Sequence, residues 1–175
     1  EGNVPHLIGY KVPGQQVNYF AFNTTNIPAF GDQRVRQAMA HAVDWETALY
    51  GANGDIYQLI DSCIPPVIDY YTSIGTYEYD VEKAKQLLEE AGYAEGLTFN
   101  CIINDTPAIV RLFEILQQYW AEVGITMEIQ SVDTATWQES LVTGTSDTSL
   151  SNMTTTTGDP HHAIAIIGDG AFTGG

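Results

Sequence analysis

The stretch from Leu97 to Gln130 reads LTFNCIINDTPAIVRLFEILQQYWAEVGITMEIQ. Apolar residues occupy every second position at 97–103 and again at 125–130, which predicts two strands that each bury one face. Between them, apolar residues recur every three or four positions as far as Gly124, which predicts an amphipathic helix. A strand, a helix and a second strand in succession are typical of an α/β or α+β fold with a mixed sheet.

Helix signals also precede this stretch. Asp32, Asp44 and Asp80 each stand just before an apolar stripe with helical spacing, so we expect three acidic N-caps. Gly92 ends the helix that Asp80 begins. Residues 51–79 are rich in glycine and proline and predict one long loop, and loops of that length are usually functional or packed over a surface.

Three further elements complete the expected domain. Residues 17–23 predict a strand that is apolar on both faces, which favours a central place in the sheet. A helix is expected at 135–143 and a last, serine- and threonine-rich strand at 148–156. The length suits one hydrophobic core, so we expect a single domain over residues 1–175.

The charge balance excludes several classes of partner. Six basic and 22 acidic residues give a formal net charge of -16, which would repel nucleic acid and anionic lipid. The acidity fits either a soluble exposed protein or a preference for cationic ligands. No signal peptide, membrane span or lipidation motif is present, and the start at Glu1 with a Gly-rich end predicts a fragment.

Catalytic signatures are nearly absent, so we do not expect an enzyme or a cofactor. There is no Gly-x-Ser-x-Gly elbow, no phosphate-binding glycine loop and no His-Glu-x-x-His motif. Cys101 shares the core face of its predicted strand and is expected to be a buried small hydrophobe. Cys63 lies in the predicted loop, and sequence leaves open whether it pairs with Cys101.

One short cluster carries chemistry. The segment Gly158-Asp159-Pro160-His161-His162 places a carboxylate and two imidazoles within four residues. These groups could help to hold a metal ion or a metal chelate. The alternative is a structural turn in which Asp159 bonds the local backbone before Pro160.

The order of several motifs resembles the family 5 bacterial extracellular solute-binding proteins, the dipeptide, oligopeptide and nickel-binding group. The resemblance runs over roughly residues 17–165. The motifs are YFAFN at 19–23, DQRVRQA at 32–38, AVD at 42–44, IPP at 64–66, YDVEKAKQLLEEAGY at 79–93, GI at 124–125 and DP at 159–160.

The resemblance implies a type II periplasmic-binding-protein-like fold, in which two lobes joined by crossover strands close on a ligand. This chain would be most of the second lobe. The partners implied are a small peptide or peptide-like ligand and the membrane permease of an ABC transporter. The implied location is extracytoplasmic: the periplasm, or the cell surface as a lipoprotein in a Gram-positive bacterium.

The resemblance also implies a ligand site around the loop after the last strand. The candidate ligand-binding residues are Asn23, Met153, Thr154, Thr155, Thr156, Thr157 and Asp159. In peptide-binding members an aspartate at the position of Thr156 pairs with the α-amino group of the ligand, and a hydroxyl cannot neutralise an ammonium. Either the alignment shifts here or the ligand is not an ordinary free peptide. The threonines could offer hydroxyls to a polar ligand, or be plain edge-strand residues.

Peptide transport is therefore the leading hypothesis for function. Capture of nickel or another metal chelate by His161 and His162 on the same scaffold is the alternative. A peptide-sensing or chaperone-like module without transport is a third reading.

Overall fold

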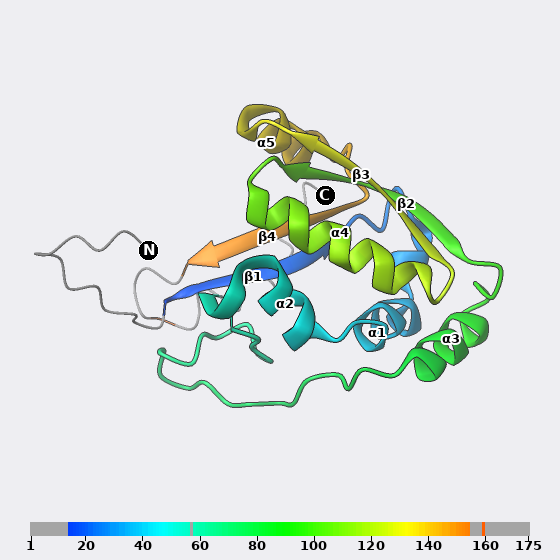
Figure 1. Ribbon diagram of the computed structural model, residues 1–175, viewed down its shortest axis with the longest axis horizontal. Coiled ribbons are helices and arrows are strands. Elements are labelled where there is room, and N and C mark those ends of the chain that lie inside the picture. Colours follow the sequence, from blue (N-terminus) through cyan, green and yellow to red (C-terminus); the bar gives the residue numbers. More distant parts are fainter. Residues whose placement is uncertain (1–13, 57, 155–158, 160–175) are drawn as a thin grey trace, which may run out of the picture.

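A computed structural model describes residues 14–56, 58–154 and 159. It consists of a four-stranded sheet with helices packed around it (Figure 1). The strands are β1 (Gln16–Phe22), β2 (Leu97–Asn104), β3 (Ile125–Val132) and β4 (Thr148–Thr154). The helices are α1 (Gln33–His41), α2 (Trp45–Asn53), α3 (Val81–Glu90), α4 (Pro107–Ala121) and α5 (Thr134–Thr143), with 3₁₀ turns η1 (Pro28–Gly31) and η2 (Gly54–Ile56).

The sheet is mixed, as the sequence predicts, with the strand order β1-β4-β2-β3. Strands β2 and β3 are parallel along their whole length, whereas β1 and β4 are antiparallel. The two halves join where β2 and β4 pair in parallel, through Cys101 opposite Thr148. The predicted α/β (α+β) class with a mixed sheet is therefore confirmed.

The predicted central position of β1 is wrong, because β1 is the first strand in the sheet order and pairs only with β4 in the described part of the chain. Its two apolar faces have another cause. Phe20 packs into the main core beside Trp120, while Val17 and Tyr19 pack with Ile60 of the long loop. β1 is apolar on both faces because both faces are covered by other side chains, not because strands pair with both of its edges.

The three predicted acidic N-caps are confirmed. The side chains of Asp32, Asp44 and Asp80 accept hydrogen bonds from the first turns of α1, α2 and α3. Thr106 is the N-cap residue of α4, but its side chain makes no capping bond to that helix. Its hydroxyl donates to the side-chain oxygen of Asn104 instead, which also accepts from the Thr106 backbone N–H at 3.0 Å.

Helix α4 supplies much of the core. Its buried residues are Leu112, Phe113, Leu116 and Trp120, which follow the predicted stripe. Figure 1 shows α2 and α4 side by side over one face of the sheet, and the rings of Phe20, Trp45 and Phe113 meet between them. The Trp120 indole N–H donates to the Met39 carbonyl at 3.0 Å and so ties α4 to α1.

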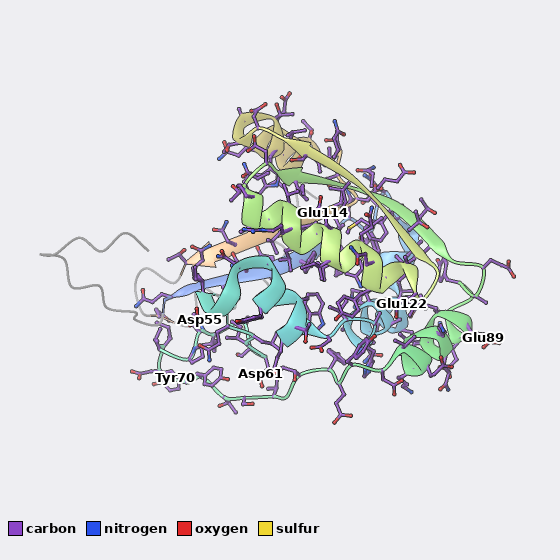
Figure 2. The ribbon with its side chains drawn as sticks, in the orientation of Figure 1. Asp55, Asp61, Tyr70, Glu89, Glu114 and Glu122 are labelled. Atoms are coloured by element: carbon purple, nitrogen blue, oxygen red, sulfur yellow. The ribbon has the colours of Figure 1, made fainter. Side chains whose placement is uncertain are left out.

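The predicted loop 51–79 is wrong at its start, because α2 continues to Asn53 and η2 covers Gly54–Ile56. It is confirmed for 58–79, which contains no helix or strand and is held in place by its own side chains. The Asp61 carboxylate accepts from the Ser73 hydroxyl at 2.5 Å, the Gly75 N–H at 2.7 Å and the Tyr71 hydroxyl at 3.0 Å. These bonds, that from Ser73 first, lower the pKa of Asp61 to about 2. Figure 2 shows Asp61 on this loop, with Tyr70 exposed further along it.

Cys63 and Cys101 are both free thiols, which answers the question of pairing that the sequence leaves open. Cys101 is buried as predicted and its thiol donates to the Thr148 carbonyl at 3.3 Å. Burial raises the pKa of the Cys101 thiol to about 12. No helix in the described ranges combines the length and the apolar character needed to span a membrane.

Candidate functional site

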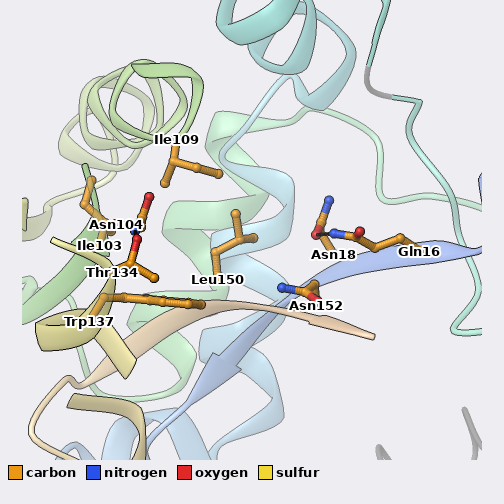
Figure 3. A pocket seen from close by; sticks show the side chains of 9 residues that line it. All are labelled: Gln16, Asn18, Ile103, Asn104, Ile109, Thr134, Trp137, Leu150 and Asn152. Carbon is orange, nitrogen blue, oxygen red and sulfur yellow. Dashed lines mark hydrogen bonds between the residues drawn. The ribbon is translucent and has the colours of Figure 1, made fainter. Parts of the chain in front are cut away.

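A pocket lies where β2 and β4 part. The two strands pair at Cys101 and Thr148, and from there β2 continues to Asn104 while β4 continues to Thr154 beside β1. A cavity of about 340 Å³ opens between their carboxyl ends and the first turns of α4 and α5 (Figure 3). Ligands of open α/β sheets characteristically bind in such crevices outside the carboxyl ends of parallel strands.

The register of β1 and β4 brings polar side chains to this pocket. Asn18 lies opposite Asn152, and Gln16 lies opposite Thr154. Because side chains alternate between the two faces of a strand, Gln16, Asn18 and Asn152 project on one side of the ladder. Asn104, at the end of β2, donates from its carboxamide to the Thr134 hydroxyl at 2.8 Å, which links β2 to the start of α5.

Apolar side chains complete the pocket. They come from four different elements, β2, α4, α5 and β4, and are Ile103, Ile109, Trp137 and Leu150. Figure 3 shows the indole of Trp137 and the side chain of Leu150 between Asn104 and Asn152. Apolar walls with a few convergent polar groups are typical of sites for small molecules.

The polar groups of the pocket are four carboxamides and one hydroxyl, and none of the described lining residues is ionisable. The Gln16 amide donates to the Asn18 oxygen at 3.1 Å. The Asn152 carboxamide has no hydrogen-bond partner in the described part of the chain, although it borders the cavity. A carboxamide both donates and accepts, so these groups match ligand atoms of either kind.

The acidic residue nearest Thr134 in sequence is engaged elsewhere. Asp133 caps α5, and its carboxylate accepts from the backbone N–H of Ala135 at 2.9 Å and from both the N–H and the hydroxyl of Thr136. These bonds, with the Thr136 hydroxyl first, lower the pKa of Asp133. The negative charge of Asp133 therefore serves the helix start and does not line the cavity.

The structure places Asn23 away from this pocket. Phe22 pairs with Thr148 and Gln16 with Thr154, so Asn23 and the pocket lie at opposite ends of the β1–β4 ladder. The Asn23 oxygen accepts from two backbone N–H groups, those of Thr25 and Asn26, and its amide donates to the Gly144 carbonyl at 3.0 Å. These bonds join the loop after β1 to the end of α5.

Two other predicted ligand-binding residues, Met153 and Thr154, are the last two residues of β4, at its pocket end. Thr154 is exposed and ends β4 opposite Gln16. Met153 is in β4 opposite Val17, and Asp159 is exposed. The remaining candidates, Thr155, Thr156, Thr157, His161 and His162, lie outside the described residues, so their roles stay predictions. Within the described residues, no three His, Cys, Asp or Glu side chains gather as a metal site.

Sequence reasoning missed the residues that line the pocket. Gln16 and Asn18 stand in a strand noted only for its apolar side chains, and Trp137 in a helix with no functional signal. The one usable signal was the two-residue spacing of Leu150 and Asn152 in a predicted strand, which puts both side chains on the same face. The pairing of Asn152 with Asn18 depends on strand register, which distant parts of the chain determine.

Comparisons with known proteins agree on one family. The model of the bacterial extracellular solute-binding proteins, family 5 Middle, matches residues 2–174. The dipeptide-binding protein of Escherichia coli K12 is 28% identical over 163 residues, which are 90% of this chain and 30% of that protein. Heme-binding protein A of Haemophilus influenzae is 30% identical over 160 residues, 88% of this chain and 29% of that protein.

Solved structures agree on the fold. HbpA2 from Haemophilus parasuis matches with a TM-score of 0.77 and 26% identity, over 88% of this chain and 31% of that one. A dipeptide-binding protein from Pseudoalteromonas in complex with Met-Leu matches with a TM-score of 0.80 and 24% identity, over 87% and 31%. The chain spans about 30% of the length of these curated relatives. It belongs to the bacterial extracellular solute-binding proteins of family 5.

Proposed function

We propose that residues 1–175 form one domain, most of the second lobe of a two-lobed protein that captures peptides for an ABC transporter. The observation that carries the proposal is the pocket at the carboxyl ends of β2 and β4, which combines apolar walls with four carboxamides. Peptides carry both backbone N–H and C=O groups, and carboxamides bond to both. The relatives that are named for dipeptide or peptide binding support the same class of ligand.

The proposed partners and location follow from this role. The membrane permease of the transporter receives the ligand, and the protein acts outside the cytoplasm, in the periplasm or at the cell surface. A net charge of -16 supports a function away from nucleic acid and anionic lipid. The role requires binding and release of the ligand without a chemical step.

The geometry suggests how capture occurs. Most of the polar residues that line the pocket are exposed, so a ligand seated in it keeps a face in contact with solvent. Closure of a second lobe over that face would add contacts and exclude water. The two-lobed protein should then bind far more tightly than this lobe alone.

The test is the thermal stability of the full-length protein with di- to hexapeptides, with nickel–histidine chelates and with haem. A peptide at a hundredfold excess over its Kd should stabilise the folded protein by about 2.7 kcal/mol. A shift with chelates or haem but with no peptide would contradict the proposal. A shift with chelates alone would favour the metal alternative at His161 and His162.

A further inference from the structure

The described residues that line the pocket carry no charge, although the protein as a whole is strongly acidic. The chain carries 22 acidic and 6 basic residues, yet no described residue that lines the cavity is ionisable. Its polar atoms belong to Gln16, Asn18, Asn104, Asn152 and Thr134. We propose that this pocket selects by charge: it takes an uncharged side chain with an amide on a short aliphatic stem, as in glutamine, and rejects charged side chains of similar length. This inference rests on the proposed function.

An anionic side chain would meet no positive partner among the described residues of the pocket. Arg111 is on α4 two residues from Ile109, which places it on the far side of that helix from the pocket, and it is exposed. Arg34 is on α1, which contributes no described lining residue, and it bonds Asp32 and the Glu90 carbonyl. Acidic residues instead follow the strands that end near the pocket, Asp105 after β2 and Asp133 after β3. Once a second lobe closes over the pocket, a carboxylate would therefore lose its water without an opposite charge from the described residues in exchange.

A cationic side chain is also disfavoured, because the described lining residues offer it no carboxylate. The Asp133 carboxylate already accepts three hydrogen bonds from the first turn of α5. The polar groups that the described walls offer an ammonium are the dipoles of carboxamides and a hydroxyl. Removal of a full charge from water needs a paired and hydrogen-bonded opposite charge.

A purely apolar side chain fits the walls but not the polar groups. Trp137, Leu150 and Ile109 can cover an aliphatic stem. An apolar group at the end of that stem would cover the Asn152 carboxamide without bonding it, which costs affinity. An amide at the same place donates to one carboxamide and accepts from another.

Isosteric peptides test this selection on the full-length protein. Calorimetric titration of Ala-Gln-Ala, Ala-Glu-Ala, Ala-Lys-Ala and Ala-Met-Ala, with the variable residue also placed first and third, compares the four side chains at every position. At one position the glutamine peptide should bind roughly tenfold or more tighter than the other three. Equal affinities of the glutamine and glutamate peptides at every position would overturn this inference and leave peptide capture intact. Binding of no peptide would overturn the proposed function, and this inference with it.

A charge placed in the pocket sharpens the test. Asn152→Asp adds a carboxylate where the free carboxamide stands, so the preference should move from the glutamine peptide toward the lysine peptide by about tenfold. Thr98→Asp adds the same charge on an exposed site near the start of β2, at the other end from Ile103 and Asn104, and should leave the preference unchanged. An equal change in both variants would assign the effect to net charge and overturn the inference.

Discussion

The two ends of the β1–β4 ladder present the same side chain in two different states. At one end the carboxamide of Asn23 bonds backbone groups through both its oxygen and its nitrogen, and that of Asn26 donates to the Gly144 carbonyl at 3.0 Å and to the Asp147 carboxylate at 3.1 Å. At the other end Asn18 and Asn152 border a cavity, and Asn152 has no bond in the described part of the chain. The carboxamides of Asn23 and Asn26 are therefore used within the fold, whereas that of Asn152 is available to a ligand.

The largest effect is expected at the bonded end, from Asp147→Ala. The buried Asp147 carboxylate accepts from the Asn100 N–H at 2.8 Å and from Asn26, so its loss leaves a strand N–H unpaired. The free energy of unfolding should fall by about 3 kcal/mol, measured by urea denaturation followed by tryptophan fluorescence. Asp69→Ala, on the exposed part of the long loop, is the control and should change it by less than about 0.5 kcal/mol. Equal losses of stability in the two variants would mean that the hydrogen bonds of Asp147 do not stabilise this end of the ladder.

A smaller loss of stability is expected from Asn23→Ala. Two backbone N–H groups lose their acceptor and the Gly144 carbonyl loses a donor, which should lower the free energy of unfolding by about 2 kcal/mol. Peptide affinity of the folded full-length protein should stay the same, because Asn23 is at the far end of the ladder from the pocket. A large loss of affinity with unchanged stability would instead support the ligand contact that the sequence predicts for Asn23.

The matching change at the open end is Asn152→Ala. It removes an exposed amide that has no hydrogen-bond partner in the described ranges, so stability should change by less than about 0.5 kcal/mol. Binding of a peptide that uses the pocket should weaken by about 1 kcal/mol, measured by calorimetric titration. The reverse pattern, lost stability and unchanged affinity, would mean that Asn152 is a structural residue.

The long loop offers a third case, because the Asp61 carboxylate is hydrogen-bonded within the loop, as Asn23 is within its own. The effect expected there is on stability at low pH. Hydrogen bonds lower the folded-state pKa of Asp61 to about 2 from an ordinary 3.8, so its contribution to stability is complete above about pH 4 and is lost as the pH falls toward 2. In Asp61→Asn the unfolding temperature should fall less between pH 4 and pH 2 than in the wild type, as scanning calorimetry would measure. An unchanged pH dependence would mean that the bonds from Ser73, Gly75 and Tyr71 do not hold the loop.

Sequence predicted those features that depend on near neighbours. The caps at Asp32, Asp44 and Asp80, the buried stripe of α4 and the core face of β2 all follow from residues one to four positions apart. The family was also predictable, because its motifs occur in a fixed order along the chain. Loop 58–79 was predicted as a loop, but the three bonds that Asp61 accepts within it were not.

Features that depend on distant pairing could not be predicted. The edge position of β1 depends on its antiparallel pairing with β4, more than a hundred residues away, and an apolar strand covered on both faces looks like a central one. The pocket depends on the same register, which sets Asn18 opposite Asn152. Asn23 ends a motif of the family, which favoured it as a ligand contact. Its bond to the Gly144 carbonyl depends on the fold and could not be predicted.

The most direct test of the central claim, that the carboxamides of the pocket form the ligand site, is a crystal structure of the full-length protein with Ala-Gln-Ala bound. The account predicts a peptide side chain in the pocket over Trp137, with its amide within hydrogen-bond distance of Asn152 or Asn18. A peptide bound against Asn23, or bound elsewhere with the pocket empty of peptide atoms, would contradict it.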